Sequence, residues 1–281
     1  MASLLALLSS LLWGSADYHA GNMSKRLPSI VVLAINQAFG LLFGLILILA
    51  TSGWISPSLS HDGYLINGAL AGLAGYGGLL CLYAGLSTGR MGVVSPISSL
   101  SVLLPLFFAL VVKGDRLSTT VTIGVIAAVL GGFLASGPEV TQGLPLKPVL
   151  LAIGAALGFG TALTFMAIGS QESSLMTMVT MRTTTLLVSA GLFIQRGNLG
   201  GVKAKDIPLL ASIGIADFSA NLLLGVATTK GLVSIAMVLG SLYPIATAVL
   251  AYLFLKERLH KAQYLGVVLA VAGVALISAA Q

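Results

Sequence analysis

A succession of long apolar segments separated by short polar ones constrains this chain more than any other feature. A helix needs about 20 apolar residues to cross a hydrocarbon core of about 30 Å. The sequence divides into ten such segments, at 3–21, 29–51, 63–88, 92–112, 118–136, 147–169, 174–195, 206–229, 231–254 and 261–279. We therefore expect an all-α integral membrane protein of ten transmembrane helices, with sequential helices packed antiparallel.

The charge content agrees with this expectation. Only 8% of the residues are charged and 57% are hydrophobic, whereas an average soluble domain has about 25% charged residues. The lipid bilayer is thus the expected partner. The Lys and Arg residues stand singly or in small clusters at the ends of apolar runs, which is typical of loops at a membrane face and does not indicate nucleic-acid binding.

Residues for metal, cofactor or enzyme chemistry are sparse. Cys81 is the single cysteine, and the three histidines are far apart and match no zinc-binding spacing. No phosphate-binding loop pattern and no catalytic constellation of carboxylates with histidine is found. We expect no metal, no cofactor and no enzymatic activity.

One passage is written twice. The segment "KGDRLSTTVTIGVIAAVLGGFLAS" at 113–136 aligns with "LKERLHKAQYLGVVLAVAGVALIS" at 255–278 at an offset of 142 (257 minus 115). "LLWGSA" at 11–16 likewise aligns with "LGFGTA" at 157–162, at an offset of 146 (157 minus 11). The chain is predicted to comprise two five-helix repeats, 1–137 and 147–281. Because five is odd, the second repeat enters the membrane inverted relative to the first, around a central cavity.

An inverted repeat predicts transport by alternating access, because exchanging the conformations of the two halves opens the cavity to the opposite side. Duplication that only built a stable bundle is the alternative. The alternating loops that carry most Lys and Arg are predicted to be cytoplasmic, which places both termini outside.

Prolines inside the apolar segments mark possible points of bending. Proline removes an amide donor and frees the carbonyl four residues earlier, which allows a kink and exposes polar backbone. The candidates for hinges or gates are Pro96, Pro105 and Pro244. A static kink is the alternative for each.

Three ionisable residues lie within predicted spans, where a charge is costly and indicates function. Arg182 and Asp217 are predicted to lie near mid-depth and to neutralise one another; an ion pair that only orders the bundle is the alternative. Asp17 and Asp217 are candidates for proton coupling. Asp17 is also compatible with a hydrated residue at the membrane interface.

Polar and aromatic residues in the same spans are candidates for a substrate pocket that holds an amphipathic solute with an apolar body. The predicted substrate-binding residues are Trp13, Tyr76, Tyr83, Ser95, Ser99, Phe159, Arg182, Asp217, Asn221 and Tyr243.

The chain resembles the drug/metabolite transporter superfamily of the EamA type. The resemblance rests on "LLWGSA", on Pro105 and Pro244, on the "DRL" and "ERL" motifs, and on the small residues spaced three or four apart in 124–131 and 266–273. It implies two inverted EamA repeats around a central cavity that serves solute export across the bacterial cytoplasmic (inner) membrane.

Within that superfamily the chain is most similar to the bacterial amino-acid exporters of the YddG kind. This similarity implies a small-molecule substrate, namely neutral aromatic or hydrophobic amino acids. Lipophilic drugs or other metabolites are alternative substrates, and an integral-membrane enzyme acting on lipid-linked substrates is a further alternative. No obligate protein partner is expected, which is compatible with a monomer.

Overall fold

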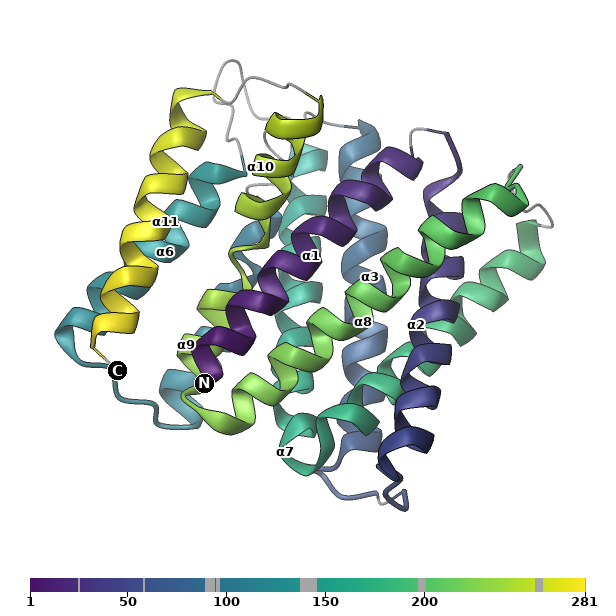
Figure 1. Cartoon of the computed structure of the whole chain (residues 1–281), viewed down its shortest axis with the longest axis horizontal. Coiled ribbons are helices and arrows are strands. Elements are labelled where there is room, and N and C mark those ends of the chain that lie inside the picture. Colours follow the sequence, from purple (N-terminus) through teal and green to yellow (C-terminus); the bar gives the residue numbers. More distant parts are fainter. Residues whose placement is uncertain are drawn as a thin grey trace.

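The computed structural model describes residues 1–24, 26–57, 59–88, 94, 97–136, 146–196, 201–255 and 260–280, and every regular element in these ranges is a helix (Figure 1). The N-terminal half contains α1 (Ala2–Ser24), α2 (Ser29–Thr51), α3 (Tyr64–Thr88), η1 (Leu100–Val102), α5 (Leu103–Phe107), η2 (Phe108–Val112) and α6 (Thr119–Ala135). The C-terminal half contains α7 (Leu146–Arg196), η3 (Ala204–Asp206), α8 (Ile207–Lys230), α9 (Val233–Gly240), α10 (Tyr243–Leu255) and α11 (Lys261–Ala279).

Six helices in the described ranges are long and apolar enough to cross a membrane: Ile30–Thr51, Tyr64–Leu82, Leu146–Gly191, Ala204–Lys230, Val233–Phe254 and Lys261–Ala279. The helices Ile97–Val112 and Thr119–Ala135 are apolar but shorter. α1 has 23 residues but ends in a polar stretch around Asp17 and His19, which lowers its mean hydropathy. The fold is that of a multi-pass membrane protein, and the count of ten spans stays a prediction.

The outer surface of the bundle is rich in large apolar side chains. Leu49 on α2, Leu187 on α7 and Val268 on α11 are among the exposed ones. Such a surface would be unfavourable in water, since contiguous apolar patches on soluble proteins rarely exceed a few hundred Å². It suits a lipid environment.

The helices are interrupted at three places. α7 continues from 146 to 196 except at Ser173, whose φ of −160° and ψ of 112° separate two helical segments. α9 ends at Gly240 and α10 begins at Tyr243, so the expected helix 231–254 is broken just before Pro244. Around Pro105 the chain passes from a 3-10 turn through a short α segment to a π turn. Helix geometry therefore changes next to both prolines, as expected for a missing amide donor.

Close packing of α6 against α11 depends on small residues. A Cβ on Gly273 would lie 2.6 Å from the carbonyl oxygen of Gly124 and from the amide of Ala128. The main chains of α6 and α11 are thus in direct contact, as in other membrane helix pairs with small residues at the interface. The pair lies side by side at one edge of the molecule (Figure 1).

Helices of one half pack against helices of the other. α1 packs along α8, and both segments of α7 pack along α3. Gly14 of α1 fits against Tyr243 and Ala246 of α10, while Gly160 of α7 fits against Ser101 and Leu104 of η1 and α5. These two glycines are aligned by the repeat, and each allows close approach to the proline-containing segment of the opposite half.

Candidate functional site

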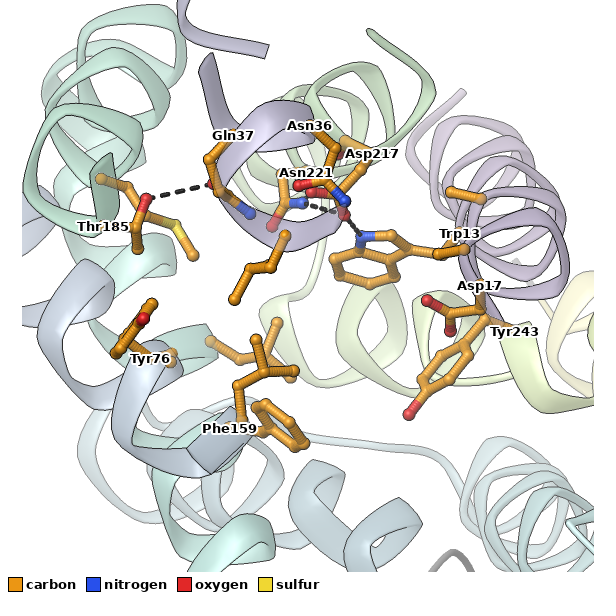
Figure 2. Close-up of a pocket in the computed structure, with 18 of the residues that line it drawn as sticks. Trp13, Asp17, Asn36, Gln37, Tyr76, Phe159, Thr185, Asp217, Asn221 and Tyr243 are labelled. Atoms are coloured by element: carbon orange, nitrogen blue, oxygen red, sulfur yellow. Dashed lines mark hydrogen bonds between the residues drawn. The ribbon is translucent and has the colours of Figure 1, made fainter. Parts of the chain in front are cut away.

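A cavity of about 260 Å³ lies between the two halves. Its wall is contributed by α1, α2, α3 and η1 of the N-terminal half and by α7, α8, α9 and α10 of the C-terminal half. Most of the lining side chains are apolar, among them Leu33, Leu79, Leu163, Ile213 and Met237. Polar groups gather at a few points of this wall (Figure 2), a composition typical of small-molecule sites.

The predicted ion pair between α7 and α8 is present. Nη2 of Arg182 lies 2.7 Å from Oδ2 of Asp217, and the Arg182 side chain is only 4% exposed. Nη1 of Arg182 also donates a 2.7 Å hydrogen bond to Oε1 of Gln37, which lies on α2. The guanidinium thus links three helices drawn from both halves, and its charge is compensated within the wall.

Asp217 is held in place by two further donors. Nε1 of Trp13 donates to Oδ1 of Asp217 at 3.0 Å. Nδ2 of Asn221, one helical turn later, donates to the main-chain oxygen of Asp217 at 2.8 Å and to Oδ1 at 3.3 Å. The Asp217 side chain keeps 25% of its surface exposed. It is therefore fixed in orientation and still accessible from the cavity.

Asp17 and Tyr243 occupy another part of the wall, on the side of Trp13 (Figure 2). Trp13 and Asp17 are four residues apart on α1 and share a face of that helix. The rings of Trp13 and Tyr243 meet edge to face, with centroids 5.9 Å apart. This corner combines a carboxylate with two aromatic rings.

Tyr76 of α3 lies on the other side of the cavity (Figure 2). Its side chain is buried, and its hydroxyl forms no hydrogen bond with any residue that the structure describes. Oδ1 of Asn36 on α2 is likewise buried and unpaired within the described ranges. A buried polar atom without a partner is unfavourable, and both residues belong to the cavity wall.

The remaining predicted residues are distributed as follows. Phe159 lines the cavity. Ser99 precedes η1 and is not among the lining residues, and neither are Pro105 and Pro244, which flank the helix interruptions. Ser95, Pro96 and the side chain of Tyr83 lie outside the described residues.

Gln37 and Thr185 are site residues that the sequence reasoning missed. Oγ1 of Thr185 donates to Oε1 of Gln37 at 3.1 Å, beside the bond from Arg182. Both are buried polar residues. The signal was available, because Gln37 adjoins Asn36 within an apolar span and Thr185 follows Arg182 by three residues on the same helix face.

In the part of the chain that the structure describes, no group of three or more His, Cys, Asp or Glu side chains is placed to hold an ion. The arrangement is a pocket with fixed charges and apolar walls. It can bind an amphipathic solute and orient its polar end.

The family model described as the EamA-like transporter family matches residues 1–137 and 146–279. A comparison with curated proteins finds no match. A crystal structure titled only as that of a protein superposes with a TM-score of 0.79 at 18% sequence identity, covering 99% of this chain and 96% of that chain. This structural similarity shows a shared fold.

Proposed function

Since the chain belongs to the EamA-like transporter family, whose members are membrane transporters of small molecules, we propose that it exports small neutral amino acids with aromatic or hydrophobic side chains. The observation that carries this proposal is the cavity between the halves, which combines the Arg182–Asp217 ion pair with an apolar and aromatic wall. An aromatic amino acid has a charged head and an apolar body, so its two parts match the two parts of the wall. The YddG-like exporters remain the subgroup that we propose for this chain.

The size of the cavity favours a small solute. At about 260 Å³ it is smaller than the roughly 300–1,000 Å³ that is common for pockets binding drug-sized ligands. A lipophilic amine is the second candidate, and the observation that favours it is the carboxylate of Asp17 at the cavity wall.

The proposed mechanism is alternating access between two inverted repeats of five spans each. Three observations support it. The family model matches the two halves separately. Both ends of the chain lie at the same end of the bundle (Figure 1). Gly14 and Gly160, which are aligned by the repeat, make matching contacts across the halves. The helix interruptions beside Pro105 and Pro244 are the proposed points of bending.

We propose the bacterial cytoplasmic membrane as the location, with both termini outside. Lys203 and Lys205 precede α8 and Lys261 begins α11, and these helices start at the end of the bundle that is opposite to the chain termini (Figure 1). Positive loop residues favour the cytoplasmic side.

Labelling of single cysteines tests this orientation. Cys81 is replaced by alanine, and Ser56→Cys or Lys203→Cys is then introduced on opposite ends of the bundle. A membrane-impermeant maleimide is expected to label Ser56→Cys in intact cells and Lys203→Cys only after lysis. The reverse pattern would invert the proposed topology, and labelling of both in intact cells would contradict an odd number of spans between the two sites.

Counterflow of labelled phenylalanine into proteoliposomes tests the function. Unlabelled phenylalanine inside the vesicles is expected to drive uptake, and neutral amino acids are expected to compete better than cationic drugs. Measurements with and without a pH gradient test proton coupling through Asp17 or Asp217. Absence of exchange by protein that shows a cooperative thermal unfolding transition would contradict amino-acid transport, and exchange of amines alone would favour the second candidate.

A further inference from the structure

Asp17 differs from every other carboxylate side chain that the structure describes. Six Asp and Glu side chains lie in the described ranges. Five have a polar partner: Asp62 contacts His61, Asp115 accepts from Ser234, Glu172 accepts from the Tyr64 amide, Asp206 binds Arg26, and Asp217 binds Arg182. Asp17 forms no hydrogen bond or ion pair with any described residue, so no described side chain compensates its charge when it is ionised.

The position of Asp17 makes this unusual. It lies on α1, seven residues (24 minus 17) and thus about 10 Å before the end of the helix at Ser24. Its side chain is exposed, and it lines the cavity. A carboxylate within a membrane helix costs roughly 2.5–3.5 kcal/mol at the centre of the bilayer and normally pairs or faces a cavity with a function. No contact in the described fold compensates that cost.

The charges of the cavity wall do not balance. Among the lining residues the ionisable acidic and basic side chains are Asp17, Arg182 and Asp217. Arg182 is paired with Asp217 at 2.7 Å. The remaining carboxylate leaves the wall with one uncompensated negative charge when it is ionised. The complementary solute brings a positive charge into the cavity.

The neighbours of Asp17 suit an ammonium group. Tyr243 lies beside Asp17 and its ring packs edge to face on Trp13 (Figure 2). Aromatic faces attract ammonium groups within about 6 Å of the ring centre, and the attraction grows when water is excluded. A carboxylate flanked by two such rings provides both charge and stacking for a primary amine.

We propose that Asp17 is the group that binds the ammonium end of the transported solute, with the rings of Tyr243 and Trp13 beside it. This rests on the proposed function and deepens it, because it assigns one end of the amino acid to one corner of the cavity. The carboxylate of an amino acid, which is attached to the same carbon as its amine, then lies in the cavity close to the amine. The side chain extends along the apolar wall that includes Phe159 and Leu163.

Three ligands of similar size separate the contributions of the two charged groups: L-phenylalanine, 2-phenylethylamine and 3-phenylpropionate. Their binding to the purified full-length protein is measured by isothermal titration calorimetry, independently of transport. Phenylalanine and 2-phenylethylamine are expected to bind, whereas 3-phenylpropionate, which lacks the amine, is expected to bind at least about tenfold more weakly.

The matched variants are Asp17→Asn and Asp62→Asn, the latter in a surface loop away from the cavity. Asp17→Asn is expected to weaken binding of both amines by about tenfold or more, because it removes a charge-assisted hydrogen bond. Asp17→Glu is expected to restore part of this affinity. Asp62→Asn is expected to bind as the unmodified protein does, and thermal unfolding of each variant verifies that it is folded.

Several outcomes would overturn the proposal. They are unchanged amine affinity in a folded Asp17→Asn variant, 3-phenylpropionate binding as tightly as the amines, or no amine binding at all. The proposed function fails separately. Asp17-dependent binding of 2-phenylethylamine without phenylalanine counterflow would refute amino-acid export but retain the amine site. Phenylalanine counterflow with unaltered kinetics in Asp17→Asn would support amino-acid transport but refute the ammonium site at Asp17.

Discussion

Arg26 and Glu172 occupy equivalent positions in the two halves, at the repeat offset of 146 (172 minus 26), and each binds the N-terminal end of a helix in the other half. Arg26 forms an ion pair with Asp206, directly before α8. Oε2 of Glu172 accepts a 2.7 Å hydrogen bond from the amide of Tyr64, the first residue of α3. Arg26 precedes α2 and Tyr64 follows it, so the two contacts lie at opposite ends of the bundle. The same cross-half contact is thus made once at each end, with different chemistry.

The Arg26–Asp206 contact predicts a specific pH dependence. Nη1 and Nη2 of Arg26 reach the two carboxylate oxygens at 2.9 and 2.7 Å. The amide of Lys203 donates a further hydrogen bond to Oδ2 of Asp206 at 3.0 Å. The ion pair requires an ionised carboxylate. Its stabilisation is therefore present at neutral pH and is lost in acid, when Asp206 is protonated.

Arg26→Gln is accordingly expected to lower the thermal unfolding midpoint by a small, constant amount between about pH 5 and pH 8. The difference from the unmodified protein is expected to shrink below about pH 4 and at high salt, since the Arg26 side chain is 47% exposed and its charge is screened. Scanning fluorimetry in detergent measures it. A difference that changed between pH 5 and pH 8 would show that a group other than Asp206 is responsible.

The effects of removing Arg182 and of removing Asp217 on the free energy of unfolding are expected to be strongly coupled. Removing Asp217 leaves the buried charge of Arg182 uncompensated, which costs about 3–5 kcal/mol. Asp217→Asn is therefore expected to destabilise the protein strongly, whereas Arg182→Gln combined with Asp217→Asn is expected to destabilise it less than the sum of the two single changes. A double-mutant cycle on the free energy of unfolding measures this coupling. Additive effects would show that the two charges are stabilised independently.

Contact between α6 and α11 predicts a sharp difference between two glycines. Gly273→Ala places a Cβ 2.6 Å from main-chain atoms of Gly124 and Ala128, whereas a Cβ on Gly77 meets no atom within 4 Å. Gly273→Ala is expected to destabilise the protein by about 1–3 kcal/mol through overpacking, and Gly77→Ala to have no such cost. Thermal unfolding compares them. Equal stability of the two variants would mean that α6 and α11 are not in direct contact.

The periodicity of the sequence predicts much of this fold because lipid imposes simple rules on length and composition. The sequence predicts a break between the helices 147–169 and 174–195, and the structure has it at Ser173, within that interval. Pro244 indicated a possible kink, and the helix is interrupted between Gly240 and Tyr243. The polar end of α1 was harder to assign, since Asp17 and His19 lower its hydropathy although the segment is helical through Ser24.

The site was predictable to the extent that it depends on charge in an apolar span. Arg182 and Asp217 meet as their depths suggested. Gln37 was missed because an uncharged amide gives a weaker signal than a charge, and its role depends on the rotation of α2 about its axis, which an apolar span leaves undetermined. The unpaired hydroxyl of Tyr76 could not be predicted either, because the hydrogen-bond partners of a tyrosine depend on how the helices pack.

Tyr76 and Tyr64 form a matched pair for testing the cavity. Both are buried on α3, but the Tyr64 hydroxyl donates a 2.8 Å hydrogen bond to the carbonyl of Ile55, whereas the Tyr76 hydroxyl has no described partner and Tyr76 belongs to the cavity wall. Tyr76→Phe is expected to leave the ligand-free protein equally stable or to stabilise it by up to about 1–3 kcal/mol, because a buried unsatisfied group is removed. Tyr64→Phe is expected to destabilise it by about 1 kcal/mol, because a hydrogen bond is lost.

Ligand binding is expected to show the opposite order. Tyr76→Phe is expected to weaken binding of a solute that hydrogen-bonds the hydroxyl by about tenfold, while Tyr64→Phe leaves the affinity unchanged because Tyr64 is not part of the cavity wall. Calorimetric titration with phenylalanine and tyrosine, together with thermal unfolding of the ligand-free variants, measures both quantities. A Tyr76→Phe variant that lost stability and kept its affinity would identify the hydroxyl as a structural group and remove Tyr76 from the binding site.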